Sequence, residues 1–280
     1  MATGRIGLWL IGAKGGVATT VMTGLAAMNR GLVEPIGLIT ETSAFHPLNL
    51  ALCRDIVIGG HDIRDESLLD EARRMWTVSR AISPDILEAV TPDLQDIETR
   101  IRPGTVLAAG RSIQAIASSP ESKKVTTPRR IIDRIRKDIV DFSNTNDIDR
   151  VIVVNLASTE PPWSLPIPNE FEEISPLLEQ TTDSSPLPTS SLYAIAAFEA
   201  DAAYINFTPS TGATPPVLNK LAQDRGIPHA GCDGKTGETL LKSVLAPMFR
   251  DRHLSVKSWV GHNIFGNLDG KILDNPSNKA

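Results

Sequence analysis

Cysteine is scarce in this chain, and the two cysteines lie far apart. Among 280 residues only Cys53 and Cys232 are cysteines, and neither belongs to a CxxC-type motif. Disulfide frameworks and cysteine-based zinc sites need several cysteines at short spacings, so the sequence argues against both. The histidines at 61, 229 and 262 are not at metal-ligand spacing either. We expect a cytoplasmic protein without a bound metal, and Cys232 as a small packed thiol.

Long apolar runs and an excess of positive charge are also missing. No stretch reaches the roughly 18 consecutive apolar residues that a membrane-spanning helix needs. The N-terminal residues run almost directly into an apolar segment, so no signal peptide is expected. The formal net charge is −5, with 28 Lys and Arg against 33 Asp and Glu. These features predict neither a membrane nor a nucleic acid as partner.

What the chain does contain is a regular alternation of apolar runs and helical patterns. We predict strands at residues 6–11, 36–40, 151–157 and 203–207, near His229, and at 255–260. Helical spacing covers residues 19–31, 67–81, 128–142, 215–225 and 237–249. This alternation predicts an α/β fold, a Rossmann-like doubly wound parallel sheet with helices on both faces.

One segment interrupts the alternation. Residues 161–188 hold seven prolines in 28 residues and few long apolar runs. Such a composition is typical of an ordered but irregular excursion, or of a mobile flap, at the C-terminal end of a strand.

A glycine cluster follows the first predicted strand and precedes the first predicted helix. Gly12, Gly15 and Gly16 stand where a dinucleotide loop turns tightly and lets backbone N–H groups approach a pyrophosphate. The spacing is GxxGG rather than GxGxxG, so a purely structural turn remains the alternative. Thr19 and Thr20 either cap the helix or donate hydroxyl groups to phosphate. Without a GK[ST] ending, a triphosphate loop is disfavoured.

Two acidic residues are candidates for the ligand of the adenosine ribose. Glu41 follows the predicted second strand, where a dinucleotide fold places its ribose-binding acid. Asp62, in IGGHDIRD, follows two glycines that indicate a backbone passing close to a ligand. The residues alone leave both open.

Several motifs together carry a family resemblance. They are GAKGGVATT from Gly12, GGHDI from Gly59, NLASTEPP from Asn155, GCDGKTGET from Gly231 and HNIFGNLDG from His262. With them the chain resembles the inositol-3-phosphate synthase (myo-inositol-1-phosphate synthase) family in its bacterial form. The resemblance covers nearly the whole chain except the proline-rich segment.

The resemblance implies a cofactor, a reaction and an assembly. Family members hold NAD tightly in a Rossmann domain that is interrupted by a second domain for catalysis and tetramer contacts. They convert glucose 6-phosphate to inositol 3-phosphate by oxidation, enolisation, intramolecular aldol closure and re-reduction. By this resemblance residues 1–260 form the NAD-binding domain, 261–280 begin the second domain, and the full-length protein is a homotetramer.

The resemblance also assigns roles to residues. Asp233 matches an active-site aspartate of the family, and Lys235, the only lysine inside a site motif here, is the second catalytic candidate. The substrate phosphate is expected to be received by Thr236, Gly237, Glu238, Asn263 and Asn267. NAD is bound by Gly12, Ala13, Lys14, Gly15, Gly16, Val17, Thr19, Thr20, Asp62, Ser158, Thr159 and Asp269. Asp62 would hold the adenosine ribose.

Simpler roles stay open for some of these residues. The alternative role of Asp233 is that of a helix N-cap, and the alternative for Lys235 is an ordinary surface lysine. Ser158 and Thr159 are equally suited to capping, and Asp269 to a glycine-flanked turn.

Some positions depart from the family pattern. The eukaryotic loop is richer in asparagine, where this one has Lys14 and Val17. Leu268 replaces an asparagine, and Glu238 replaces a glutamine and would repel phosphate unless a cation or lysine intervenes. The family's essential lysines are expected beyond Ala280, so these residues alone are expected to bind NAD without completing catalysis. The alternatives are a carbocycle-forming relative that uses another sugar phosphate, or a non-catalytic NAD-binding module.

Overall fold

Six parallel strands form the centre of the fold. The computed structural model describes residues 4–180, 185–234 and 237–260, and the statements below concern these residues. The strands are β1 (Ile6–Ile11), β2 (Ile56–Asp62), β3 (Ile101–Pro103), β4 (Arg150–Asn155), β5 (Ala203–Asn206) and β6 (His229–Ala230). Their order in the sheet is β3-β2-β1-β4-β5-β6. This is the order of a doubly wound dinucleotide-binding sheet, so the predicted fold class is confirmed.

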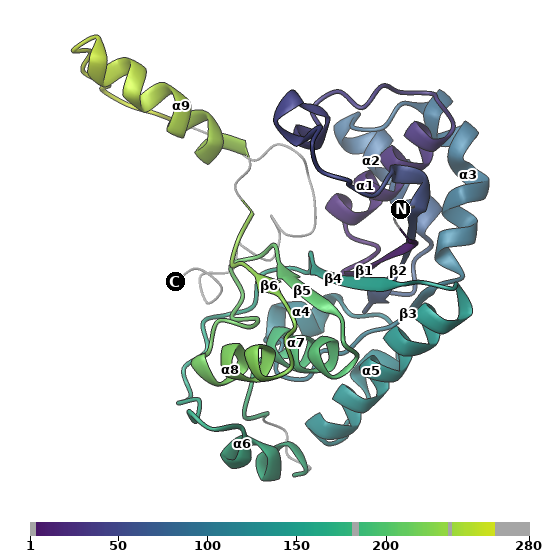
Figure 1. Ribbon diagram of the computed structural model, residues 1–280, viewed down its shortest axis with the longest axis vertical. Coiled ribbons are helices and arrows are strands. Elements are labelled where there is room, and N and C mark those ends of the chain that lie inside the picture. Colours follow the sequence, from purple (N-terminus) through teal and green to yellow (C-terminus); the bar gives the residue numbers. More distant parts are fainter. Residues whose placement is uncertain (1–3, 181–184, 235–236, 261–280) are drawn as a thin grey trace.

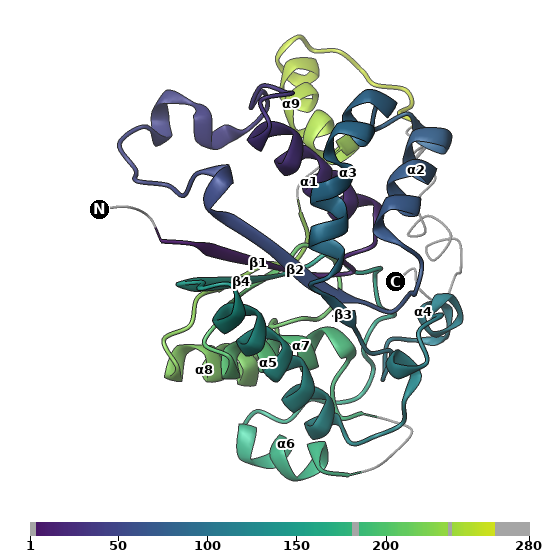
Figure 2. The ribbon, with the colours of Figure 1, turned by 90° about the vertical axis from the view of Figure 1, so that its right-hand side faces the viewer.

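Helices cover both faces of this sheet (Figures 1 and 2). One face carries α1 (Gly16–Asn29), α2 (Leu68–Ser79) and α3 (Pro84–Glu98). The opposite face carries α5 (Pro128–Thr145), α7 (Thr189–Glu199) and α8 (Pro216–Asp224). Two shorter helices are α4 (Arg111–Ile116) and α6 (Phe171–Leu178). Among the described residues, no helix combines the length and the apolar character that crossing a membrane requires.

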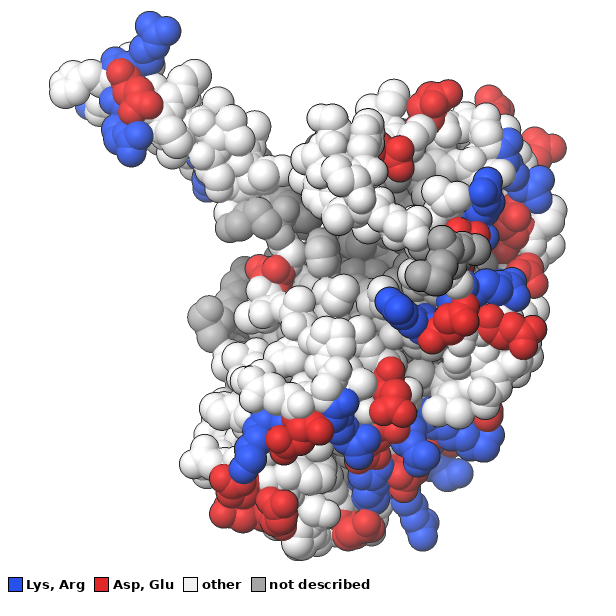
Figure 3. Space-filling view, viewed as in Figure 1, with Lys and Arg blue, Asp and Glu red and all other residues white. Residues whose placement is uncertain are grey.

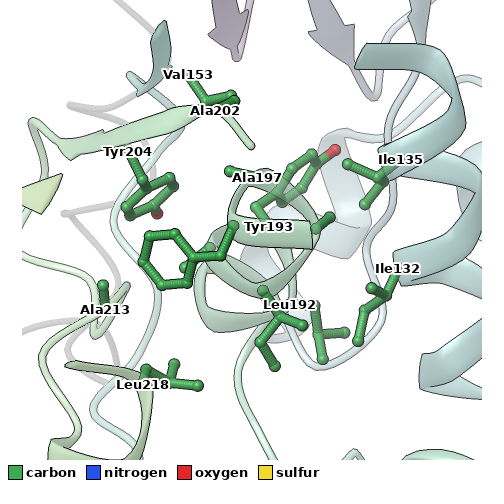
Figure 4. Close-up of a cluster of buried hydrophobic side chains, with 14 of the residues drawn as sticks. Ile132, Ile135, Val153, Leu192, Tyr193, Ala197, Ala202, Tyr204, Ala213 and Leu218 are labelled. Atoms are coloured by element: carbon green, nitrogen blue, oxygen red, sulfur yellow. The ribbon is translucent and has the colours of Figure 1, made fainter. Parts of the chain in front are cut away.

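The two faces of β1 supply two separate cores, because successive side chains of a strand point to opposite faces. Trp9 packs in the cluster beneath the sheet, whereas Leu10 packs in the cluster beneath α1 and α3. Figure 4 shows the first cluster, with α7 placed between Ile132 of α5 and Tyr204 of β5. Residues 189–198 of α7 are all buried, as expected for a helix enclosed on every side.

The predicted strand at residues 36–40 is wrong. These residues form a turn followed by the short 3₁₀ helix Ile39–Glu41, and Ile36 is 90% exposed. Gly37 has a φ of 91°, which breaks an extended run. The strand after β1 in the chain is β2, which pairs with β1 in register from Ile6 opposite Ile56, while β4 pairs with the other edge of β1.

Two glycines in the middle of β2 explain why the sequence pattern did not predict this strand. A Cβ at Gly60 would lie 2.2 Å from the Leu10 carbonyl oxygen. A Cβ at Gly59 would lie 2.9 Å from ring carbons of both Trp9 and Phe142. Tertiary packing, rather than strand propensity, therefore requires glycine at both positions.

The predicted strand at residues 255–260 is also wrong, since these residues have no regular structure and follow α9 (Gly237–Asp251). This helix projects away from the sheet (Figure 1). The segment after α9 lies against the helix, where Lys242 Nζ is 5.7 Å from the centre of the Trp259 ring. No strand among the described residues is placed to pair with it.

The remaining predicted elements are present, with ends shifted by a few residues. The helix predicted from residue 19 begins at Gly16, and the one predicted to end at 142 continues to Thr145. The proline-rich segment 161–188 leaves the carboxyl end of β4 and contains α6. Figure 3 shows acidic and basic side chains intermixed over the lower face of the molecule and a hollow at its centre.

Candidate functional site

A cavity of about 380 Å³ opens at the carboxyl ends of the central strands. Its wall combines the glycine loop after β1 with the segments that follow β2, β4 and β5. The sheet changes direction between β1 and β4, because the chain leaves β1 toward β2 on one side and returns to β4 on the other. Ligands of doubly wound proteins bind at this switch point.

The glycine loop is held tightly and leaves the end of α1 open. Gly12 has a φ of 80°, and a Cβ there would lie 2.9 Å from the Ala157 Cα. The Gly15 N–H donates to the Gly12 carbonyl at 2.9 Å, and a Cβ at Gly15 would lie 3.0 Å from that oxygen. Gly15 offers no capping side chain, and the first turn of α1 has no acidic residue. The positive end of the helix is thus open to an anion, and the cradle fits a pyrophosphate.

Asp62 is buried at the end of β2 and bonds directly to this loop. Its Oδ2 accepts from the Lys14 backbone N–H at 2.6 Å, and its Oδ1 accepts from the Arg64 N–H at 2.9 Å. Arg64 also donates to the Lys14 carbonyl. One acid therefore joins the carboxyl end of β2 to the phosphate-binding loop of β1.

His61, beside Asp62, is buried and neutral. Trp9 Nε1–H donates to His61 Nδ1 at 3.0 Å, which assigns the ring proton to Nε2, 3.1 Å from Asp138 Oδ2. Burial lowers the pKa of His61, with the hydrogen bond to Asp138 opposing the effect. The His61 carbonyl accepts from the N–H groups of Gly12 and Ala13 at 2.9 and 3.0 Å. His61 lies on β2 and supports the glycine loop through its carbonyl.

A buried acid, Glu160, connects three segments at the other side of the cavity. Its carboxylate accepts from the N–H of Ser190 at 2.8 Å and from the Ser190 hydroxyl. Its own N–H donates to Ser210 Oγ at 3.0 Å. The Gly212 N–H in turn donates to Ser190 Oγ at 2.9 Å. The segments after β4 and β5 and the start of α7 are thereby locked together.

Burial raises the pKa of Glu160 to about 7, although the bonds from Ser190 oppose the shift. The carboxyl therefore changes protonation near neutral pH in the wall of the cavity. Carboxyl groups with a shifted pKa are common at functional sites, because such sites bury ionisable groups and surround them with other charges. Further along the same wall, Asn155 Nδ2 donates to Asn206 Oδ1 at 3.1 Å and ties β4 to β5.

Many of the cofactor-binding residues predicted from the sequence meet at this cavity. Its lining includes Gly12, Gly15, Gly16, Val17, Asp62, Ser158 and Thr159, and also Asp233, which was predicted as a catalytic residue. Asp233 has a φ of 70°, and its N–H donates to the Thr208 carbonyl at 3.0 Å. The segment predicted to carry catalysis therefore begins at the same cavity as the glycine loop.

Other predicted cofactor ligands point elsewhere. The Lys14 ammonium lies 3.4 Å from Glu98 Oε1, and Ala13 is fully buried. Thr19 is fully buried in α1, and the Thr20 hydroxyl donates to the Gly16 carbonyl at 2.8 Å. The N–H groups of Ala13, Lys14 and Thr19 also donate within the protein, so the part of this segment that stays open to an anion is the uncapped start of α1.

Some predicted residues do not line the cavity, and others fall outside the described residues. Glu41 is exposed on the 3₁₀ helix Ile39–Glu41, and Gly237 begins α9. Glu238 pairs with Lys242 at 3.0 Å. Lys235, Thr236, Asn263, Asn267 and Asp269 fall outside the described residues.

Two further observations concern cysteine and metal. Cys232 is exposed, so its prediction as a packed thiol is wrong; the left-handed Asp233 that follows it turns the chain outward. Within the described ranges, no group of three or more His, Cys, Asp or Glu side chains is arranged to hold a metal ion.

Sequence reasoning missed three charged residues of the cavity wall: Arg64, Glu71 and Glu160. Glu160 follows the predicted Ser158 and Thr159 directly, and Arg64 lies two residues beyond Asp62. Their proximity to predicted ligands was the available signal, but only the fold shows that they are buried and paired.

Together, the strand order and the glycine cradle define a dinucleotide-binding protein of the Rossmann class. A family model for the NAD-binding domain of myo-inositol-1-phosphate synthase matches residues 6–254, and a second model with the same description matches residues 237–280. The chain belongs to the myo-inositol-1-phosphate synthase family, and its cofactor is NAD.

Named relatives agree with this family. The chain is 32% identical over 290 residues to inositol-3-phosphate synthase 1 of Bacteroides thetaiotaomicron, covering 99% of this chain and 65% of that protein. It is 28% identical to the Dictyostelium discoideum inositol-3-phosphate synthase, covering 97% of this chain and 57% of that protein. The chain thus spans less than two thirds of the length of these relatives.

Solved structures agree with the fold. Inositol-3-phosphate synthase from Caenorhabditis elegans superposes with a TM-score of 0.71 at 22% identity, covering 89% of this chain and 53% of that one. A myo-inositol-1-phosphate synthase-related protein from Thermotoga maritima gives 0.64 at 22% identity, covering 99% and 69%.

Proposed function

We propose that this chain forms the NAD-binding part of an enzyme that converts glucose 6-phosphate to inositol 3-phosphate. The observation that carries the proposal is the shared cavity: the glycine cradle and the Asp233 segment line the same wall. The names of the relatives supply the reaction, and the cavity supports it because cofactor and sugar must meet in one enclosed space.

In this proposal the uncapped start of α1 binds the pyrophosphate, and the glycine loop gives the pyrophosphate room to approach it. Asp62 accepts hydrogen bonds from the adenosine ribose, and Ser158 and Thr159 contact the nicotinamide ribose. NAD supplies a hydride acceptor that is regenerated within each cycle. Because the reaction causes no net oxidation, a cofactor that stays bound is sufficient.

At the sugar end, we assign Asp233 and Lys235 to proton transfer and to stabilising developing oxyanions. Fixed positive charge stabilises an enolate strongly when water is excluded. Thr236, Gly237, Glu238, Asn263 and Asn267 are assigned to the substrate phosphate, and Asp269 to the cofactor. The pairing of Glu238 with Lys242 at 3.0 Å supplies the cation that makes a glutamate compatible with a nearby phosphate.

We also propose a cytoplasmic homotetramer for the full-length protein. The division into an NAD-binding domain at residues 1–260 and the start of a second domain at 261–280 remains a prediction. The second family model supports a second unit at this end of the chain, but it begins to match earlier, at residue 237.

The test of the reaction uses the protein expressed from its complete gene, incubated with NAD and glucose 6-phosphate. We expect inositol phosphate, measured as periodate-released phosphate, and none from mannose 6-phosphate or fructose 6-phosphate. Gly15→Val serves as the cofactor-free control. Product from another sugar phosphate but not from glucose 6-phosphate would contradict the proposed substrate.

A further inference from the structure

The wall of the cavity near Asp62 holds an arginine as well as an acid. Arg64 is 9% exposed and lines the cavity. Its Nε lies 3.3 Å from Asp62 Oδ1, and another guanidinium nitrogen lies 3.7 Å from Glu71 Oε2. The guanidinium is thus held between two carboxylates and the Lys14 carbonyl.

These two residue types favour different cofactors. An acid after the second strand binds the free 2′-hydroxyl of NAD, whereas an arginine nearby accommodates the 2′-phosphate of NADP. Because Arg64 and Asp62 line the same part of the cavity, the state of Arg64 decides which of these interactions is available.

Glu71 is well placed to control Arg64. It comes from the first turn of α2, is 5% exposed and lines the cavity. Arg74 Nε donates to Glu71 Oε2 at 2.9 Å, which fixes the carboxylate in place. With Asp62 and Glu71 facing Arg64 and Arg74, the group carries no net charge and offers little attraction to a phosphate dianion.

We propose that Glu71 determines cofactor choice by holding Arg64 away from the 2′ position, so that the chain selects NAD over NADP. Arg64 could bind a 2′-phosphate, and its ion pair with Glu71 prevents this. This inference rests on the cofactor site proposed above, with Asp62 at the adenosine ribose.

The experiment is a calorimetric titration of the chain with NAD and, separately, with NADP. Wild type binds NAD at least tenfold more tightly. Glu71→Gln removes one of the two carboxylate charges that hold Arg64 and lowers that preference about tenfold, chiefly by raising NADP affinity, because one arginine–phosphate pair contributes about that much. Adding Arg64→Gln to Glu71→Gln removes the gain. Glu66→Gln, the same change at an exposed neighbouring acid, leaves the preference unaltered.

Two results overturn the inference: wild type binding both cofactors equally, or a preference in Glu71→Gln within twofold of wild type. If Glu71→Gln does not fold by circular dichroism, Glu71→Asp replaces it, since it withdraws the carboxylate by one methylene. An unchanged preference for NAD over NADP in Glu71→Asp would also overturn the inference. Gly15→Val separates the two proposals: if it leaves both affinities unchanged, the cofactor site itself is misplaced.

Discussion

At the scale of single residues, Asp62 combines a structural contact with a place in the cavity wall. It accepts the Lys14 N–H at 2.6 Å and lies at the carboxyl end of β2, whereas Glu41 is exposed on a 3₁₀ helix. We predict that Asp62→Ala weakens NAD binding at least about tenfold, since a charge-assisted hydrogen bond is lost. Glu41→Ala should leave it within about twofold. Isothermal titration measures both, and the reverse order would identify Glu41 as the ribose ligand.

Glu160 gives the fold a pH dependence that the sequence does not reveal. Its pKa rises from the ordinary 4.5 to about 7 in the folded state, because burial disfavours the carboxylate. The folded protein therefore holds a proton that the unfolded chain releases. This contribution to stability is complete below pH 4.5 and is lost as the pH rises through 7.

We predict that Glu160→Gln removes this dependence while it retains an acceptor for Ser190. Relative to wild type, the variant should gain about 2–3 kcal/mol in free energy of unfolding between pH 5 and pH 8. Urea denaturation at both pH values measures the difference. His61, whose lowered pKa acts in the opposite direction, is present in both proteins and cancels. Glu34→Gln, at an exposed acid, is the control, and a Glu160→Gln difference that is constant with pH would contradict the account.

At the scale of elements, β2 depends on glycine for its contact with β1. A Cβ at Gly60 would lie 2.2 Å from a backbone oxygen, whereas at Gly24, inside α1, it would meet nothing within 4 Å. We predict that Gly60→Ala lowers the free energy of unfolding by about 3 kcal/mol through overpacking. Gly24→Ala should raise it by about 0.5–1 kcal/mol. Equal effects of the two substitutions in chemical denaturation would show that the strands are not packed this closely.

The same strand shows what the sequence could and could not predict. The apolar run of β1 and the one-sided pattern of α5 are local signals, and both elements were predicted. The glycine pair of β2 has low strand propensity and is required by Trp9, Leu10 and Phe142, which are distant in sequence. Residues 36–40 carry the β-branched composition of a strand but have no neighbouring strand to pair with among the described elements.

The site residues also fall into those that the sequence predicted and those that it did not. The three glycines of the loop, Asp62 and the Ser158–Thr159 pair were predicted from motifs, and all line the cavity. Glu160 bonds to Ser190, 30 residues further along the chain, and Arg64 meets Glu71 from the next helix. Pairings of this kind depend on tertiary placement, which local sequence does not encode.

At the scale of the whole molecule, the sheet and its two helical layers form one body from which α9 projects (Figures 1 and 2). The chain leaves this body through Asp233 and Gly234, which line the cavity, so the connection to α9 starts at the proposed site. Exposed apolar side chains on α9 include Leu240, Leu241, Val244 and Met248. The cavity is therefore bounded by the sheet on one side and by the start of this connection on the other.

The most direct test of the account is NAD binding by wild type, Gly15→Val and Gly24→Val, measured by isothermal titration, with folding checked by circular dichroism. A valine at 15 fills the space against Gly12 that the pyrophosphate loop needs, whereas position 24 has no neighbour within 4 Å. We predict saturable binding by wild type and Gly24→Val, and no detectable binding by a folded Gly15→Val. Unchanged NAD affinity in a folded Gly15→Val protein would contradict the placement of the cofactor at this cavity.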